Sequence, residues 1–360
     1  MHRRDFLGKA ALTALATGGV LTGCGVPQGT EFSAPDTGRR FHWRMVTAWP
    51  HDSPGLGGGA QLLARMLHEL SEGRIQVRIF AADDLVSPFK IFGAVSRGAA
   101  EIGHGAAHYW QGKSGAAQFF TAVPFGMDAL ETQAWLHEGG GLELWRDLYR
   151  PFDVIPFPCG NTGAQMGGWF QHDIQTLADL QGLPIRAAGL GGEVLRRAGA
   201  QVIHLPGDDL PEAMAAGQLA AAEWMGPYED MALGLHRQAP YYYHPGWQAP
   251  GFQVEALINR DAYEVLPQHL QVAVAQACRL AGEQMLQTFL ARNQQTLDRL
   301  VSEHGVQLKR FPTPVLDKLR RLTQDLLVAM AEDDPFIRRV HAAYMGFQSD
   351  MVRWKEINAI

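Results

Sequence analysis

The order of apolar and polar residues divides the first part of the chain into short alternating elements. Residues 41–48 and 74–80 alternate between apolar and polar, which is the pattern of strands with one buried face. Between them, a glycine-rich turn at residues 55–59 leads into leucines and a methionine at helical spacing. A further helix over residues 88–97 and a strand over residues 100–105 follow. Strand, helix, strand, helix and strand at this spacing predict parallel strands joined by crossover helices.

A second αβ series runs over residues 154–223, and helices dominate the rest of the chain. In the second series we expect short strands at Ile185, 202–205 and 219–222, with short helices at 192–199 and 211–217. A strand at 252–259 follows. The remainder is predicted to form long helices at 269–304, 314–330 and 335–357, with a brief strand at 306–311. The aromatic run at residues 241–247 is broken by Pro-Gly, so we interpret it as a loop. This order predicts two sheets with a cleft between them, and ligands beyond the carboxyl ends of the strands.

The amino terminus has the pattern of an export signal and not of a folded element. Residues 3–9 (Arg-Arg-Asp-Phe-Leu-Gly-Lys) carry a twin-arginine pattern, and the alanine-rich run over residues 10–20 is too short to span a bilayer. Residues 21–24 (Leu-Thr-Gly-Cys) resemble a lipoprotein cleavage site, which predicts a lipid on Cys24; a plain cleaved signal with an incidental cysteine is the alternative. Glycine, proline, serine and threonine over residues 25–40 are typical of a flexible tether.

Charge and cysteine content exclude several classes of protein. The formal net charge is −6 at pH 7, and loss of residues 1–23 removes three basic residues and one acidic residue, so the remaining chain is more acidic still. Such a chain is no nucleic-acid binder by charge alone. No run after the signal has the apolar length of a membrane helix, so we expect contact with a membrane only through a lipid anchor. Beyond Cys24 only Cys159 and Cys278 remain, whose pairing the spacing leaves open, and the sequence has no Cys/His metal cluster.

Three segments combine the chemistry of a small-anion site. Residues 159–170 are rich in glycine and amides, include Gln165 and end in aromatic residues, which suits a backbone that approaches a small ligand. Arg186 ends a short strand, and Glu223 with Trp224 ends an apolar run. An arginine fork binds a planar carboxylate, while amide, carboxylate and backbone carbonyl oxygens suit an alkali or alkaline-earth cation. We therefore expect an organic anion bound with its counter-cation; the alternative is a structural ion pair between Arg186 and Glu223, with Gln165 a surface amide.

Other cleft candidates follow from their place after a strand. His104, His108 and Tyr109 lie at or just after the third strand, where the ligands of parallel sheets sit. A packed aromatic residue or a buried core histidine is the more common role for each of them alone. Residues 55–59 lack the Lys-Ser/Thr pair of a phosphate loop, so we expect their glycines to shape the backbone, with helix-start amides that face the cleft.

Three motifs carry a resemblance to a known family: residues 160–170 (GNTGAQMGGWF), 223–228 (EWMGPY) and 241–247 (YYYHPGW). With them, the chain from residue 41 to the last long helices resembles the substrate-binding proteins of tripartite ATP-independent periplasmic (TRAP) transporters, the DctP-like family, and among them the members that bind 2-oxo acids. The resemblance implies an α/β, two-domain periplasmic-binding-protein fold with a ligand cleft between the domains and long carboxyl-terminal helices. We place domain I at residues 41–160 and 250–290, domain II at residues 161–249 and 291–360, and the signal and tether at residues 1–40.

The resemblance also implies roles for residues. It assigns the substrate carboxylate to Arg186 and the cation ligands to Gln165, Glu223 and the carbonyl of Trp224. We expect the full set of substrate contacts to be Arg186, Gln165, Asn161, His104, Tyr109 and Glu223. Similar proteins tend to have an acid two residues after the Pro-Gly-Trp sequence, where this chain has Gln248-Ala249-Pro250, so we expect Gln248 to supply a neutral oxygen in place of a charged one. Because this ligand set holds one formal negative charge, we expect sodium, with calcium as the alternative.

The function that the resemblance implies is that of a receptor without catalytic residues. It would capture a small 2-oxo or 2-hydroxy monocarboxylate, such as pyruvate, in the periplasm and deliver it to membrane permease subunits. We also expect a homodimer built through the carboxyl-terminal helices, with residues 344–347 in its interface. One alternative is a periplasmic enzyme that acts on the same acid with His104 or Glu223 as general base. The other is a ligand-sensing subunit of a signalling system.

Overall fold

The computed structural model describes residues 38–50 and 52–358, which pack as one compact unit. The predicted twin-arginine signal, the lipid on Cys24 and most of the tether therefore lie outside the described residues. Within the described part, no helix is both long enough and apolar enough to cross a membrane.

The first sheet contains five strands in the order β2-β1-β3-β10-β4. Its strands are β1 (Phe41–Thr47), β2 (Ile75–Phe80), β3 (Ile102–Gly105), β4 (Val154–Asn161) and β10 (Gln253–Asn259). Strand β1 pairs in parallel with both β2 and β3, which confirms the predicted crossover series. Strand β10 runs antiparallel between β3 and β4, so the chain returns to the first sheet after it has built most of the second.

The second sheet contains six shorter strands in the order β11-β9-β5-β8-β6-β7. They are β5 (Gly168–Phe170), β6 (Pro184–Arg186), β7 (Gln201–Ile203), β8 (Ala221–Ala222), β9 (Tyr241–His244) and β11 (Gln307–Arg310). Strand β6 pairs in parallel with β7 on one side and β8 on the other, as the sequence predicts. The first sheet takes its strands from the segments assigned to domain I and the second from those assigned to domain II, with Asn161 the one residue across the boundary. The domain boundaries themselves stay a prediction.

The prediction of a loop over residues 241–247 is wrong for its first four residues. Tyr241–His244 forms β9, which pairs antiparallel with β5 and parallel with β11. The cause is cross-strand packing: the ring of Tyr242 stacks on that of Trp169 with centroids 3.9 Å apart, and its hydroxyl donates to Asp230 at 2.8 Å. Such aromatic pairs stabilise a strand, so only the residues from Pro245 onward form the turn.

Helices surround both sheets. They are α1 (Leu56–Leu70), α2 (Ile91–Ser96), α3 (Ala129–Glu138), α4 (Gly141–Tyr149), α5 (Gly189–Arg197), α6 (Leu210–Ala215), α7 (Pro227–Leu233), α8 (Arg260–Glu264), α9 (Gln268–Ser302), α10 (Thr313–Asp333) and α11 (Pro335–Asn358). The three long helices at the end match their predicted positions. Helices α3, α4, α7 and α8 were not predicted from the sequence, although Asp128 and Glu131 form a capping box at the start of α3.

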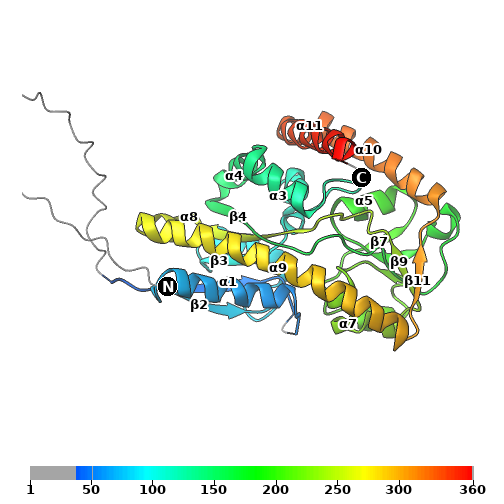
Figure 1. Ribbon diagram of the computed structural model, residues 1–360, viewed down its shortest axis with the longest axis horizontal. Helices are drawn as coiled ribbons and strands as arrows, with labels where there is room; N and C mark the ends of the chain where they lie inside the picture. Colours follow the sequence, from blue (N-terminus) through cyan, green and yellow to red (C-terminus); the bar gives the residue numbers. More distant parts are fainter. Residues whose placement is uncertain (1–37, 51, 359–360) are drawn as a thin grey trace, which may run out of the picture. The chain divides into compact units, whose positions relative to one another are not determined.

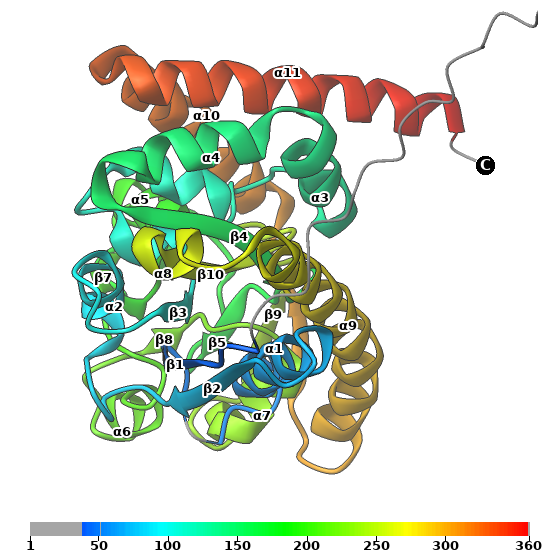
Figure 2. The same cartoon turned by 90° about the vertical axis from the view of Figure 1, so that its left-hand side faces the viewer.

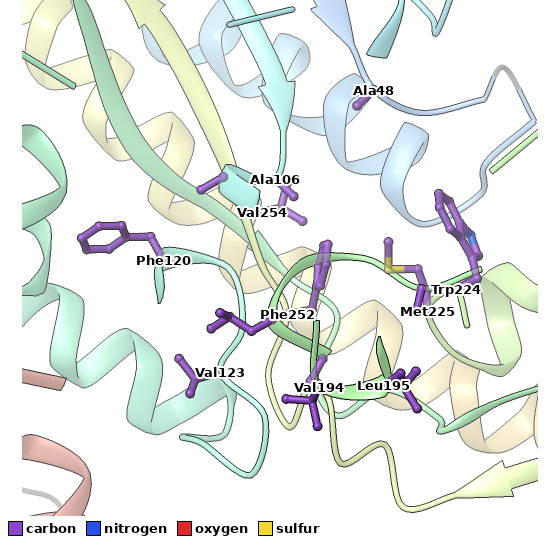
Figure 3. Packing of buried hydrophobic residues seen from close by; sticks show 14 of the residues in the cluster. Ala48, Ala106, Phe120, Val123, Val194, Leu195, Trp224, Met225, Phe252 and Val254 are labelled. Atoms are coloured by element: carbon purple, nitrogen blue, oxygen red, sulfur yellow. The ribbon is translucent and has the colours of Figure 1, made fainter. Parts of the chain in front are cut away.

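Helix α9 connects the two halves of the fold. It packs against α1 and β4 of the first sheet and against α7, which follows β8 of the second (Figures 1 and 2). One hydrophobic cluster fills the space between the first sheet, α1 and α9. A larger one joins residues of both sheets, and Figure 3 shows Trp224, Met225 and Phe252 among its members. The segment that carries Glu223 and Trp224 is therefore anchored in this larger cluster.

The carboxyl-terminal helices place the predicted dimer segment differently from the expectation. Tyr344 is buried within its own chain, where its ring meets that of Trp135 and its hydroxyl accepts the N–H of Met127 at 2.8 Å. Phe347 is half-buried against Gly139, and of the apolar side chains in the segment only that of Met345 is exposed. Tyr344 therefore stabilises the fold of the protomer, and an interface through this segment stays a prediction.

Candidate functional site

One small cavity brings together most of the predicted site residues. It lies between the two sheets, has a volume of about 30 Å³, and is lined by Tyr109, Gln165, Arg186, Glu223, Trp224 and Gln248, with other residues described below. These residues come from five separate segments of the chain. A cavity of this size holds a few heavy atoms, so it suits a very small solute.

Arg186 is the cationic residue of the cavity and is 3% exposed. It is the last residue of β6, as the sequence predicts. Its Nε donates to the carbonyl of Leu205 at 3.2 Å, and its Nη1 donates to the carbonyl of Glu223 at 2.7 Å. The guanidinium carbon lies 4.9 Å from the ring centroid of Trp224. These contacts fix the guanidinium plane before any anion arrives, which lowers the ordering cost of binding.

Glu223 lies just beyond β8 and faces Arg186. Its Oε2 is 3.2 Å from Nη1 of Arg186, and the residue is 8% exposed. Burial raises the pKa of the Glu223 carboxyl to about 7, although the positive charge of Arg186 acts in the opposite direction. The long ion pair therefore does not fully offset the loss of water around the carboxylate. A bound cation would supply the missing positive charge.

Two amide oxygens complete a candidate cation site. Oε1 of Gln165 and Oε1 of Gln248 are buried and have no hydrogen-bond partner among the described residues. The Gln248 Nε2 group donates to the carbonyl of Met166 at 2.7 Å, which fixes the orientation of this amide because its oxygen would otherwise face another oxygen. A buried acceptor without a hydrogen-bond partner lowers the folding stability by about 1–3 kcal/mol. Two such oxygens beside the Glu223 carboxylate are hard ligands of the kind that bind sodium or calcium.

Trp224 lines the cavity, and its indole lies beneath the guanidinium of Arg186. The role of its carbonyl oxygen as a cation ligand stays a prediction. Among the described residues no group of three or more His, Cys, Asp or Glu side chains could hold a metal. A cation in this cavity would therefore depend on amide and carbonyl oxygens together with one carboxylate.

His104 and Asn161 do not line this cavity. The Nδ1 atom of His104 accepts the indole N–H of Trp49 at 2.6 Å, and burial lowers the pKa of this histidine to about 3. Asn161 accepts the N–H of Gly163 at 2.8 Å through Oδ1, which shapes the loop before Gln165. Substrate contact stays a prediction for both residues, and the contacts in the structure give them structural roles.

The histidine that lines the cavity is His108, beside Tyr109. Burial lowers the pKa of His108 to about 3, and the charge of Arg186 adds to the effect, so the ring is neutral at pH 7. Its backbone N–H donates to the hydroxyl of Thr121 at 2.9 Å, and its Nε2 has no partner among the described residues. Burial also raises the pKa of Tyr109, whose hydroxyl lies near Arg186 and stays protonated. Both side chains can exchange hydrogen bonds with a polar solute.

Other parts of the wall, among them Thr121, Phe252 and the start of α5, were not predicted from the sequence. Thr121 lies in an irregular segment without a recognisable signal, whereas the Gly-Leu-Gly-Gly sequence at residues 189–192 was visible. Gly191 approaches Gln248 so closely that a Cβ on it would lie 2.6 Å from the Gln248 Cβ. The first turn of α5 therefore reaches the cavity because it lacks a side chain there, and its amides favour an anion.

Comparisons with known proteins show the family to which the chain is similar. The profile of the bacterial extracellular solute-binding proteins, family 7 (DctP), matches residues 45–334. The monocarboxylate 2-oxoacid-binding periplasmic protein of Nostoc sp. (strain PCC 7120) is 37% identical over 361 residues, which cover 100% of this chain and 97% of that protein.

Two crystal structures are also similar along most of their length. A TRAP periplasmic solute-binding protein from Pseudoalteromonas atlantica, with bound sodium and pyruvate, is 36% identical with a TM-score of 0.86 over 89% of this chain and 97% of that one. One from Colwellia psychrerythraea, with bound calcium and pyruvate, is 34% identical with a TM-score of 0.86 over 89% and 98%. The α/β architecture with two sheets and long carboxyl-terminal helices is thus the fold of these binding proteins. This chain belongs to the DctP family of TRAP solute-binding proteins.

Proposed function

We propose that this protein is the periplasmic receptor that binds a small 2-oxo or 2-hydroxy monocarboxylate of the pyruvate type together with a cation. The observation that carries the proposal is the combination of one fixed guanidinium with two unpaired amide oxygens and a carboxylate in a single small cavity. Similar proteins hold pyruvate with sodium or with calcium, which supports the same pairing here. The receptor would deliver its solute to the membrane permease subunits of the transporter.

The charges of the cavity suggest how the solute is held. Arg186 and the amides at the start of α5 attract the carboxylate of the solute. The neutral imidazole of His108 and the hydroxyl of Tyr109 can hydrogen-bond to its remaining oxygens. A cation held by Gln165, Gln248 and Glu223 would screen the negative charge of Glu223 from that of the solute carboxylate.

We infer that the cation is sodium, with calcium as the alternative. The protein offers one carboxylate and neutral oxygens, and calcium usually takes six to eight oxygen ligands with more negative charge. Sodium demands less negative charge from its ligands. The neutral amide of Gln248 therefore favours the monovalent ion.

The cavity provides no catalytic set in support of the enzyme alternative. His104 lies outside the cavity, and the low pKa of His108 leaves it a weak base. Glu223, the other base of that alternative, does line the cavity with a pKa of about 7, but its carboxylate faces the guanidinium of Arg186 at 3.2 Å. The described lining residues contain no serine or cysteine beside a base. Incubation of the purified protein with pyruvate, followed by NMR, should therefore show no turnover.

Membership of the family supports a periplasmic location. We propose export through the twin-arginine route, followed by attachment of a lipid to Cys24, so that the receptor stays at the membrane surface. A homodimer through the carboxyl-terminal helices is a further part of the proposal. The exposed apolar residues Met345, Val352, Trp354 and Ile357 of α11 support it better than Tyr344 does.

Calorimetric titration of pyruvate in sodium, choline and calcium buffers tests the proposed ligand and cation together. Ligand and cation share contacts, so each should tighten the binding of the other by the same factor. For wild type we expect tighter binding in sodium than in choline, and for Glu223→Gln a much smaller difference. Identical affinities of both proteins in all three buffers would show that Glu223 is a structural residue and that the anion binds without a cation.

A further inference from the structure

A second buried acid, Glu229 on α7, reaches across the fold to the start of α1. Its Oε1 accepts the backbone N–H groups of Gly55 and Leu56, each at 2.7 Å. The hydroxyl of Ser53 donates to both carboxylate oxygens, at 3.1 and 2.9 Å. The helix-start amides that the sequence analysis expected at the cleft are therefore occupied by this carboxylate. An acid at a helix start accepts otherwise unpaired N–H groups and meets the positive end of the helix dipole.

The two partners belong to different halves of the fold. Helix α1 connects β1 and β2 of the first sheet, whereas α7 follows β8 of the second. Figure 2 shows α7 beside α1, and both helices pack against α9. The hydrogen bonds of Glu229 therefore join the two halves, while those of its neighbour Asp230 stay within one half, with Trp169 and Tyr242 as donors.

The local packing shows that this contact is built into the fold. A Cβ on Gly55 would lie 2.8 Å from Glu229 Oε1 and 2.5 Å from the ring of Phe289, so the close approach requires glycine. Glu229 is 1% exposed, and burial raises the pKa of its carboxyl to about 7, although its donors act in the opposite direction. A buried acid is costly, and its donors at the start of α1 offset that cost only while the two halves are in contact.

The same helix is tied directly to the wall of the cavity. Asp230 accepts the N–H groups of Met225 and Gly226, both at 3.0 Å, and Met225 lines the cavity beside Trp224. Ser53 and Glu229 also border a groove of about 300 Å³ with Asp52, Asp208 and Pro211. The contact thus lies at the edge of an open groove and not deep in the shared hydrophobic cluster.

We propose that Glu229 is a positioning residue that latches α7 onto the start of α1 and so keeps the cavity closed over its solute. This inference rests on the proposed function, because a latch matters only where a solute is captured and released. Glu229 does not line the cavity, so its effect on affinity must act through closure. The latch stabilises the closed, liganded form more than the open form, which slows release of the solute.

Two variants and one control test the latch. Glu229→Ala removes the acceptor, and Ser53→Ala removes one donor; the matched control is Glu212→Ala, an exposed acid on α6. We expect Glu229→Ala to raise the Kd for pyruvate in sodium buffer about tenfold or more, mainly through faster dissociation in stopped-flow, and Ser53→Ala to have a smaller effect of the same kind. The double variant should be less than additive, because both changes break one contact. The control should match wild type.

A merely structural contact gives a different result. It would lower the thermal stability of Glu229→Ala equally with and without pyruvate and leave Kd and the dissociation rate unchanged, which would overturn the proposal. Hydrogen exchange of the Gly55 and Leu56 amides provides a readout that needs no ligand. We expect it to be faster in Glu229→Ala than in wild type, and unchanged exchange would also overturn the latch. Failure of wild type to bind any 2-oxo acid would instead contradict the proposed function.

Discussion

Arg186→Lys tests the anion site most directly. Lysine keeps the positive charge beside Glu223 but replaces the planar fork with a single nitrogen. It therefore cannot bond the carbonyls of Leu205 and Glu223 and still present a donor pair to the solute. Alanine is a poorer choice, because it leaves the buried Glu223 without its positive partner, at a cost of about 3–5 kcal/mol in folding stability.

The expected magnitude follows from the bonds that are lost. Hydrogen bonds to charged groups contribute about 1.5–3 kcal/mol each, so the loss of one fork contact with the solute should weaken binding roughly 10- to 100-fold. The free energy of unfolding should fall by only about 1–2 kcal/mol, because the charge remains. Calorimetry with pyruvate in sodium buffer measures the first quantity, and denaturant unfolding measures the second.

The control for this variant is Arg196→Lys, which changes an exposed arginine on α5 that pairs with Glu193. We expect its affinity and stability to match those of wild type, since surface ion pairs contribute little. A folded Arg186→Lys protein that binds pyruvate within twofold of wild type would refute the role of the guanidinium as the anion anchor.

Three further predictions concern other parts of the chain. Gly191→Ala should displace Gln248, because the new Cβ would lie 2.6 Å from the Gln248 Cβ. We expect calorimetry to show that pyruvate binding depends less on sodium than in wild type. An unchanged sodium dependence would exclude Gln248 from the cation site. Burial raises the pKa of Glu255 to about 8, so the folded protein binds more protons than the unfolded chain above pH 4.5, and stability should fall as pH rises from 5 to 9. In Glu255→Gln the free energy of unfolding should depend less on pH, with a difference on the order of a few kcal/mol between about pH 5 and 9. The same pH dependence in both proteins would show that Glu255 is ionised throughout this range. Cys24→Ser should release the protein from the membrane fraction or leave it unprocessed, and a soluble wild type that is cleaved elsewhere would contradict lipidation.

Local patterns in the sequence predicted much of the fold. The alternation in β1 and β2 and the apolar face of α1 are visible in short windows, since each element buries one side. The run that became β9 was misjudged because its stability comes from stacking on Trp169, more than seventy residues away in the chain. Pairing across such distances leaves no local signal.

The charged residues of the candidate site could be predicted from the sequence, whereas several of its uncharged wall residues could not. Arg186 and Glu223 are charged residues at the ends of apolar strands, where a charge requires an explanation, and the structure places both in one cavity. Thr121 and Phe252 reach that cavity only through the path of the folded chain, so their residue types carried no signal. His104 shows the opposite difference: it lies at the end of β3 as predicted, but its ring accepts the indole N–H of Trp49 and does not line the cavity.

Helix α9 has a mechanical consequence for the exchange of solute. Gly282 brings the helix so close to β4 that a Cβ there would lie 3.2 Å from the backbone of Cys159 and Gly160, which seats the first part of the helix firmly on the first sheet. Phe289, one turn beyond Met285, already touches Gly55 and Tyr228, at the contact between the two halves. Rotation of one sheet relative to the other would therefore either shift α7 along the helix or bend the helix beyond Phe289. The helix is fixed on the first sheet at one end and contacts α7 of the second half further along. Its resistance to bending therefore helps to set how far the cleft can open.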